Sequence, residues 1–478
     1  METKRIAVIG AGISGMTAAY HLAQARQAGA PVEEYLFEAS DRLGGVIRTE
    51  RIEDCLVEAG PDAFLTEKSE ALALCQRLGL VAQLVGSEDH QRRTLILRKG
   101  KLVPLPDGFE FMVPTRPLSV LGTPLLSLGD KLALVTEVFR RAGPTPRDES
   151  VAAFVQRHFS RGLLENIVEP LLTAVYGGDP YHLSVQSTLP RMAAIEKESG
   201  SLVRGMHRAA RQRNRQAFSP QSEPAVRPPL FTTLRDGLET LVVALRMNLA
   251  EERILCQRQV TAVTADAATS GYRLHIEGQE DFAADAVILA LPARETAHLL
   301  HELDTEMARS LVDVHYSSSV IVAVGYEAAK VKPLPAGFGF LVPQKEGGRV
   351  RACSFVGHKF PGRVPSHRVL LRCFLGGMGD ETVLQLSDKE ITATVRAELE
   401  RILGMAGEPL FAKVYRWPKA MAQYTVGHQQ RLAAIRARLS RHHGLFLAGN
   451  GYEGVGVPDC IRSGRLAAEV CVSKVRRA

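Results

Sequence analysis

The chain has 478 residues, of which 45% are hydrophobic and 23% are charged. This composition excludes a mostly disordered chain, and the length predicts about three domains. The formal net charge of +7 is too small to indicate a nucleic-acid-binding protein. The 7 cysteines include no C-x-x-C pair, which argues against a disulfide framework and a zinc site and favours a reducing cytosol.

The N-terminus and the hydropathy pattern bear on location. The chain begins METKRIAVIG, which leaves no room for the apolar core of a signal peptide. Its longest apolar candidate, residues 117–128, is broken by Gly122 and Pro124 and is shorter than the ~20 residues that span a bilayer. We therefore expect a cytoplasmic protein, with peripheral contact as its closest approach to a membrane.

The predicted elements begin with a βαβ unit. Residues 4–9 form a short apolar run that ends at glycine, which predicts a buried strand. Residues 13–28 are predicted as a helix and residues 34–38 as a second strand, so the chain opens an α/β domain with a parallel sheet. The later predicted elements are a helix over 67–85, a hairpin over 94–103, mainly helices over 117–212, a proline-rich loop over 213–230, strands over 253–291 and 317–377, and helices over 388–403 and 459–472.

Residues 10–15 read G-x-G-x-x-G between the predicted strand and helix, which is the context that this fingerprint requires. Gly10 permits a tight turn, Gly12 lets the backbone approach a pyrophosphate at the helix N-terminus, and Gly15 lets helix and strand pack closely. Glu38 ends the second strand, where its carboxylate can hydrogen-bond a ribose diol. The segment therefore predicts a dinucleotide site.

Two further segments extend this site. Residues 38–49 (EASDRLGGVIRT) contain a glycine pair that admits close backbone contact and two arginines that can bind phosphate. Residues 448–464 (AGNGYEGVGVPDCIRSG) form a glycine-rich loop before the last predicted helix. The N-terminus of that helix would place positive potential beside a bound anionic group.

Together with other blocks, these segments resemble the flavin-containing porphyrinogen oxidase family, which includes oxygen-dependent protoporphyrinogen oxidases and coproporphyrinogen III oxidases. The resemblance runs essentially end to end. Its most specific blocks are residues 58–62 (EAGPD), 169–180 (EPLLTAVYGGDP), 233–241 (TLRDGLETL), 416–428 (RWPKAMAQYTVGH) and 452–461 (YEGVGVPDCI). The cofactor that it implies is FAD, and it implies no metal.

The resemblance also implies the fold, which is α/β (α+β overall). Family members have a Rossmann-like FAD-binding domain, a mixed-sheet substrate domain and a helical membrane-associating domain. Carried over by order along the chain, the FAD domain comprises 1–89, 231–309 and 412–478, the substrate domain 90–108, 200–230 and 310–411, and the helical domain 109–199.

The expected reaction is the six-electron oxidation of protoporphyrinogen IX to protoporphyrin IX, a late step of haem biosynthesis. Three flavin reductions are needed because a flavin accepts two electrons at a time, and each reoxidation by O2 releases H2O2. No side-chain acid or base is demanded, so no catalytic residue is assigned beyond the flavin. The candidate FAD-binding residues are Gly10, Gly12, Ile13, Ser14, Gly15, Glu38, Ala39, Arg42, Gly44, Gly45, Arg48, Thr49, Gly60, Pro61, Asp62, Val260, Trp417, Gly449, Val455, Gly456 and Val457.

The candidate substrate residues follow from local matching to the family. Leu341 and Phe374 match positions that sandwich the ring, and Ser354 falls where the family often has an apolar residue. Ala174 matches a position that acts through its carbonyl. The arginine that binds a propionate in the family is replaced by Thr94, so Arg92 and Arg93 are the candidate anchors. Because coproporphyrinogen oxidases of the family often lack that arginine, coproporphyrinogen III is the alternative substrate.

Different protein classes are less consistent with the sequence. An amine oxidase usually builds an aromatic cage beside the flavin, whereas this chain has 6% aromatic residues and Trp417 as its one tryptophan. A carotenoid desaturase and a flavin-binding protein without turnover fit the quoted blocks less well than a porphyrinogen oxidase does. The family allows a homodimer and contact with a downstream haem-pathway enzyme. The basic cluster over 191–229 lacks interleaved aromatic residues, so no nucleic-acid partner is expected.

Overall fold

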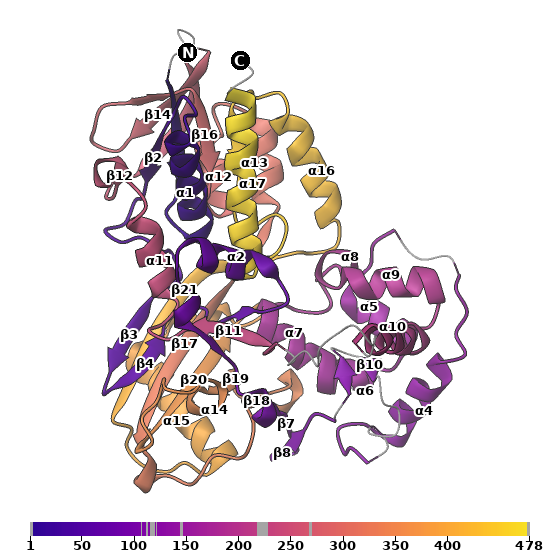
Figure 1. The fold of residues 1–478 in the computed structure, drawn as a ribbon. Coiled ribbons are helices and arrows are strands. Elements are labelled where there is room, and N and C mark those ends of the chain that lie inside the picture. Colours follow the sequence, from indigo (N-terminus) through magenta and orange to yellow (C-terminus); the bar gives the residue numbers. More distant parts are fainter. Residues whose placement is uncertain are drawn as a thin grey trace.

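The computed structural model describes residues 3–475 except 107, 111–112, 115–119, 121, 144–146, 218–227 and 267–269. The protein has a mixed α/β fold in three parts (Figure 1). A parallel sheet with its helices lies at the top of Figure 1, a larger sheet lies below it, and a group of helices lies at the right. The fold class expected from the sequence is confirmed.

The first sheet has five parallel strands. In spatial order they are β12 (Ile254–Leu255), β2 (Val32–Phe37), β1 (Lys4–Ile9), β16 (Ala286–Leu289) and β22 (Leu445–Leu447). Successive side chains of a strand point to opposite faces, so Ile6 and Val8 enter one core and Ala7 and Ile9 enter another. All four are buried, which explains the unbroken apolar run of β1.

Different elements cover the two faces of this sheet. The Ile6 face is covered by the helices α1 (Ile13–Gln27), α2 (Ser69–Arg77), α11 (Glu239–Arg246) and α17 (Val457–Val475). The Ala7 face is covered by the antiparallel strands β13 (Val260–Asp266), β14 (Gly271–Ile276) and β15 (Phe282–Ala284) and by the helices α12 (Ala293–Leu299), α13 (Thr305–Val312) and α16 (His428–Leu439).

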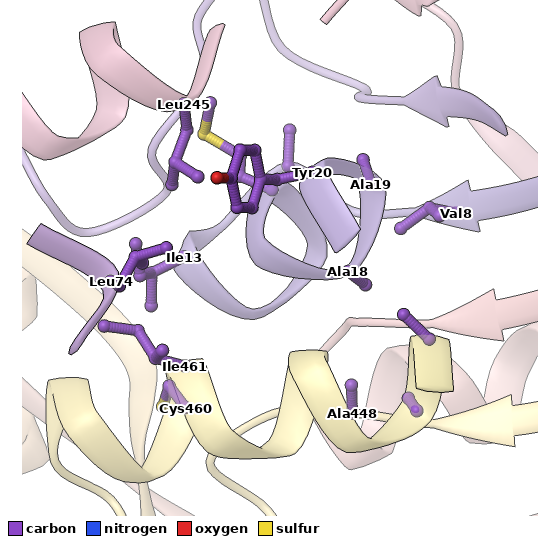
Figure 2. Close-up of a cluster of buried hydrophobic side chains, with 14 of the residues drawn as sticks. Val8, Ile13, Ala18, Ala19, Tyr20, Leu74, Leu245, Ala448, Cys460 and Ile461 are labelled. Atoms are coloured by element: carbon purple, nitrogen blue, oxygen red, sulfur yellow. The ribbon is translucent and has the colours of Figure 1, made fainter. Parts of the chain in front are cut away.

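Helices α1 and α17 lie side by side in the first core. Figure 2 shows Ile13 of α1 beside Leu74 of α2 and Ile461 of α17. A Cβ on Gly464 would lie 2.0 Å from the carbonyl oxygen of Ser14, so the two backbones touch there and no larger residue fits. Both helices follow parallel strands and pack on the same face, so they run in the same direction.

The second sheet has seven strands. In spatial order they are β21 (Phe411–Gln423), β17 (His315–Glu327), β20 (Arg368–Gly376), β19 (Val350–Phe355), β18 (Gly339–Leu341), β7 (Thr94–Arg98) and β8 (Lys101–Pro104). Only the pair of β18 and β7 is parallel among these neighbours, so the sheet is mixed. Helix α15 (Asp388–Leu403) covers one face, and α14 (Val356–Lys359) follows β19.

The remaining elements are helical segments and short strands. The helices are α4 (Leu128–Glu137), α5 (Val151–His158), α6 (Arg161–Leu163), α7 (Glu169–Tyr176), α8 (Val185–Thr188), α9 (Pro190–Ser199) and α10 (Leu202–Ala217). The short strands pair as β3 (Thr49–Ile52) with β4 (Cys55–Glu58), β9 (Phe109–Glu110) with β10 (Val113–Pro114), and β11 (Phe231–Leu234) between β5 (Phe64–Leu65) and β6 (Leu84–Gly86). No helix in the described part of the chain is long and apolar enough to cross a membrane.

Three sequence expectations differ from this architecture in detail. The loop expected over 213–230 is wrong at its start, because α10 continues to residue 217, and residues 218–227 lie outside the described residues. Leu202 and Met206 pack in the helical core, although residues 200–230 are predicted to belong to the substrate domain. The expected boundary at 411/412 falls at the first residue of β21, which belongs to the seven-stranded sheet.

Candidate functional site

The first glycine-rich loop follows β1 at the carboxyl edge of the parallel sheet. Gly10 has a φ of +97°, and a Cβ there would lie 2.7 Å from the carbonyl oxygen of Ala290. A Cβ on Gly15 would lie 1.8 Å from the carbonyl oxygen of Gly10. By contrast, a Cβ on Gly12 would meet nothing within 4 Å. Gly10 and Gly15 are therefore required by packing, while Gly12 exposes its backbone to open space at the start of α1.

The second glycine segment lies directly against the first. Gly44 forms an isolated bridge with Gly12, and its N–H donates to the carbonyl of Ala11 at 2.8 Å. The guanidinium of Arg42 donates to the carbonyls of Gly45 and Ile47, each at 2.6 Å. Arg42 therefore shapes this loop directly, and its expected role on a phosphate stays a prediction.

Glu38 joins both segments. Its carboxylate accepts from the backbone N–H of Ala11 at 2.8 Å and from that of Ser40 at 2.9 Å. The backbone N–H of Arg258 donates to the Glu38 carbonyl at 2.9 Å. This bond holds the start of β13, which begins at Val260, close to Glu38. Glu38 is half-buried, and its expected contact with a ribose stays a prediction.

The C-terminal glycine-rich loop lies at the same edge of the sheet. The N–H of Ala448 donates to the carbonyl of Leu289 at 2.9 Å, and the N–H of Gly449 donates to the Ser463 hydroxyl at 3.1 Å. Because Gly464 contacts Ser14, the first turns of α17 extend about 10 Å past the start of α1. Val455, Gly456 and Val457 therefore lie beyond the first loop, at a second positive helix end.

This arrangement fits FAD. Open space at Gly12 and the N-terminus of α1 suit a pyrophosphate, and Glu38 lies where a ribose would be held. The N-terminus of α17 further along would lie beside the flavin. The described ranges bring no group of three or more His, Cys, Asp or Glu side chains together for a metal.

Residues 58–62 connect the glycine loops to the seven-stranded sheet. The N–H of Ala59 donates to the Arg48 carbonyl at 2.9 Å, and a Cβ on Gly60 would lie 1.9 Å from the Val46 carbonyl. On the other side, the indole N–H of Trp417 donates to the Ala59 carbonyl at 2.7 Å. The expected cofactor residues Gly60, Pro61 and Asp62 thus lie between the two parts of the site.

A buried charge cluster fixes this connection. Arg372 is 1% exposed, donates to the carbonyl of Gly60 and lies 3.3 Å from the carboxylate of Asp62. Lys359 pairs with the same carboxylate at 2.9 Å. Burial alone would raise the pKa of Asp62, but Lys359 and Arg372 outweigh it and hold that pKa well below its ordinary value. The cluster therefore stays charged and holds Asp62 against the sheet.

Three of the substrate candidates share one face of the seven-stranded sheet. Leu341 pairs with Ala352, and Ala352 pairs with Phe374 on the next strand. Ser354 pairs with Arg372. Paired residues of adjacent strands point to the same face, so Leu341, Ser354, Phe374 and Arg372 all project from the face opposite α15. Leu341 and Phe374 are 33 residues apart in sequence, and the order of the strands brings them onto one face.

The remaining substrate candidates lie at the border of this face. Arg92 and Arg93 are exposed, and the Arg93 carbonyl accepts from the N–H of Phe338 at 3.0 Å, just before β18. Ala174 is an exposed residue of α7. Helix α7 is tied to the end of β18, because the Glu169 carboxylate accepts from the N–H of Gln344 at 3.0 Å.

Two expected cofactor residues have protein partners. The hydroxyl of Thr49 donates to the buried carboxylate of Glu58 at 2.7 Å, and Arg48 pairs with Glu50 at 2.6 Å. Burial raises the pKa of Glu58, which also pairs with Arg363 at 3.0 Å. Thr49 therefore ties β3 to β4 at the open end of this strand pair, opposite the turn, and its contact with a cofactor stays a prediction.

Sequence reasoning missed Arg372 and Lys359. No local motif marks them, because their partners lie about 300 residues away. For Arg372 the usable signal is a charged residue with apolar neighbours on both sides inside a strand, as in VLLRCFL of β20. Such a residue is buried only when it is paired.

Comparison with known proteins agrees with this geometry. The family model described as flavin containing amine oxidoreductase matches residues 13–472. A coproporphyrinogen III oxidase of Bacillus subtilis (strain 168) is 34% identical, with 97% of each chain covered. A mitochondrial protoporphyrinogen oxidase of Nicotiana tabacum is 27% identical, with 99% of this chain and 95% of that protein covered. A crystal structure from Exiguobacterium sp. 255-15, provisionally named protoporphyrinogen oxidase, has a TM-score of 0.85 at 27% identity and covers 99% of this chain and 100% of its own.

The chain therefore belongs to the flavin-containing amine oxidoreductase family. It is an oxidoreductase of the flavin-containing kind, and the relatives named above are porphyrinogen oxidases. The resemblance drawn from the sequence blocks is confirmed, and so is the flavin cofactor.

Proposed function

We propose that this protein oxidises a porphyrinogen to the corresponding porphyrin with FAD as the cofactor and O2 as the final electron acceptor. The observation that carries this proposal is the chain of contacts between the two halves of the site. Gly12 lies against Gly45, Val46 against Gly60, and Gly60 against Arg372, which stands two residues from Phe374. A ring on the sheet face would therefore lie next to a cofactor held at the glycine loops.

The residues on the sheet face would bind and orient the ring. Leu341 is buried and Phe374 is partly buried, so they offer apolar contact to a macrocycle and exclude water from it. When bound, FAD supplies a two-electron acceptor that can be used three times for a full porphyrinogen oxidation. The protein groups have to hold the ring in one orientation, which is the contribution that positioning makes to rate.

We propose coproporphyrinogen III as the preferred substrate, with protoporphyrinogen IX, the substrate expected from the sequence, as the alternative. The relative with 34% identity is named for the first substrate, and the one with 27% identity for the second. Thr94 replaces the expected arginine, while the exposed pair Arg92 and Arg93 remains beside the face. Ser354 makes the face more polar, which suits a substrate with four carboxylates better than one with two.

The test is a comparison of the two substrates under air. We expect oxygen-dependent porphyrin fluorescence to rise faster with coproporphyrinogen III, with a higher kcat/KM, and hydrogen peroxide to form in step. A higher kcat/KM for protoporphyrinogen IX would overturn the substrate assignment and keep the reaction class. Rates equal to non-enzymatic oxidation for both substrates would overturn the reaction class.

We also propose peripheral membrane contact through α4. Leu128, Leu132 and Val135 of α4 are 85%, 63% and 50% exposed, and their spacing of four and three residues places them on one helix face. Phe139, two residues after the end of α4, is 76% exposed and adds a fourth apolar side chain to this stripe. Arg141 beside this stripe is exposed and suits anionic headgroups.

Flotation with vesicles that contain anionic lipid tests the membrane contact. We expect the protein to float with the vesicles, and Leu132→Glu or Phe139→Glu to reduce the floating fraction several-fold. Val243→Glu changes an exposed apolar residue of α11 and serves as the control. Equal flotation of all variants would contradict the role of α4, and concentration-dependent dimers lost in Leu132→Glu would assign the stripe to a second copy instead.

A further inference from the structure

The segment from Gln423 to His428 connects three parts of the site. β21 ends at Gln423 and α16 begins at His428. The backbone carbonyl of Tyr424 accepts from the N–H of Ser184 at 2.8 Å, which ties the segment to the helical part of the molecule. This segment belongs to the 416–428 block, to which the function proposed above gives no role beyond Trp417.

Gln423 fixes the segment from the substrate side. Its side chain is fully buried, and its amide donates to the carbonyl of Tyr176 at 2.7 Å and to the hydroxyl of Ser317 at 2.9 Å. Tyr176 is the last residue of α7, the helix that carries Ala174. The start of the segment is thereby held at the end of the substrate-side helix.

Tyr424 holds the C-terminal glycine-rich loop at two points. Its hydroxyl donates to the carbonyl of Asn450 at 2.7 Å and accepts from the N–H of Gly454 at 2.6 Å. The side chain is buried, and burial raises the pKa of Tyr424, so the hydroxyl stays protonated and can make both bonds. One hydroxyl therefore closes residues 450–454 into a fixed loop just before α17.

His428 packs against the ring of Tyr424. The two rings are stacked with their centroids 4.2 Å apart. Nε2 of His428 lies 3.0 Å from the carbonyl oxygen of Tyr452. Burial lowers the pKa of His428, which favours the neutral ring, and Nε2 must then carry the proton that the carbonyl accepts. The loop between Asn450 and Gly454 is thus held at its middle as well as at its ends.

We propose that Tyr424, backed by His428, is a positioning residue for the bound flavin. It fixes the 450–454 loop and so the approach to the N-terminus of α17, where positive potential favours the reduced, anionic cofactor. The inference rests on the proposed placement of FAD at this loop. It does not depend on which porphyrinogen is oxidised.

The test compares Tyr424→Phe with Tyr272→Phe. Tyr272 is a matched control, because it is also buried and donates one hydrogen bond to a backbone carbonyl, that of His443, outside the loop. FAD is removed from each protein, and the dissociation constant for FAD and the midpoint potential of the reloaded flavin are measured. For Tyr424→Phe we expect about tenfold weaker FAD binding and a lower midpoint potential, while the control matches the wild type.

Equal FAD affinity and equal potential in the two variants would overturn the proposal. His428→Leu provides a second variant if Tyr424→Phe does not fold, since it removes the ring stacked on Tyr424 and the hydrogen bond to Tyr452 but keeps the Tyr424 hydroxyl. We expect the same direction of change in potential for His428→Leu, and an unchanged potential would contradict the proposal. Both readouts concern the flavin alone, so they remain interpretable if the protein oxidises no porphyrinogen.

Discussion

At the scale of single residues, Glu38 has a structural role in the dinucleotide site besides its expected contact with a ribose. Its carboxylate holds Ala11 in the first glycine loop and Ser40 in the second segment. We therefore expect Glu38→Ala to lose both the ribose acceptor and the shape of the loop. The measurement is flavin content after extensive dialysis, which should fall clearly below that of the wild type. Full flavin content after dialysis would contradict this role.

Arg93 is the residue that tests the substrate anchor. It is exposed beside β18, and its side chain has no assigned task in FAD binding. We expect Arg93→Ala to raise the KM for the porphyrinogen about tenfold, as for loss of a charged hydrogen bond, with flavin content unchanged. Arg246→Ala, which removes an exposed arginine of α11 that pairs with Glu251, is the control. An unchanged KM would move the anchor to Arg92 or to another basic group.

Residue-scale prediction from sequence succeeds where the cause is local. The packing roles of Gly10 and Gly15 follow from their spacing between strand and helix, and the structure shows the contacts that require glycine. Arg372 and Tyr424 could not be found in this way. Their partners, Gly60 for one and Asn450 for the other, are set by which strands and loops become neighbours.

At the scale of elements, the contact between α1 and α17 positions both helix ends of the site. Gly464→Ala would place a Cβ 2.0 Å from the Ser14 carbonyl and force the helices apart. We expect a loss of about 1–3 kcal/mol in the free energy of unfolding together with weaker FAD retention. Gly143→Ala, where a Cβ meets nothing within 4 Å, should change neither quantity. Wild-type stability in Gly464→Ala would contradict the packing argument.

A second prediction at this scale concerns the helical part. His158 lies 3.0 Å from the Glu137 carboxylate and 2.9 Å from that of Glu196, so this cluster joins α4, α5 and α9. Burial alone would raise the pKa of Glu196, but hydrogen bonds from Arg157 and His158 outweigh it and lower that pKa. The stability that Glu196 contributes is therefore complete above its ordinary pKa of 4.5 and is lost as the pH falls through the lowered value.

Chemical unfolding at neutral and acidic pH measures this contribution. We expect Glu196→Gln to cost about 1–3 kcal/mol at neutral pH, because it weakens charged hydrogen bonds in a partly buried ion pair, and to lose less stability on acidification than the wild type. Glu251→Gln changes an exposed carboxylate and is the control. A pH dependence identical to that of the wild type would contradict the role of Glu196.

Element prediction from sequence is limited by tertiary contacts. The hairpin around Lys99 and Gly100 is local and appears as β7 and β8. The helix predicted over 67–85 ends at Arg77 instead, and residues 84–86 form β6, because β11 supplies a pairing edge from residues 231–234. The end of α10 also extends past the predicted loop start, since the polar residues of 213–217 do not by themselves end a helix.

At the scale of the whole molecule, the proposed site lies where three parts of the chain meet. The parallel sheet supplies the glycine loops, the seven-stranded sheet supplies the face with Phe374, and the helical part supplies α7. Buried polar contacts join them, including Trp417 with Ala59, Arg372 with Gly60 and Gln423 with Tyr176. We propose porphyrinogen oxidation because these contacts hold the sheet face with Leu341 and Phe374 beside the flavin site.

The most direct test of this account is anaerobic mixing of the FAD-loaded protein with coproporphyrinogen III. The visible flavin absorbance and porphyrin fluorescence are followed together. We predict that the flavin absorbance bleaches, that fluorescent porphyrin appears in limited amount, and that admitting oxygen restores the absorbance and drives further product. A flavin that stays oxidised with both porphyrinogens, yet bleaches with an amine or a carotenoid, would contradict the account.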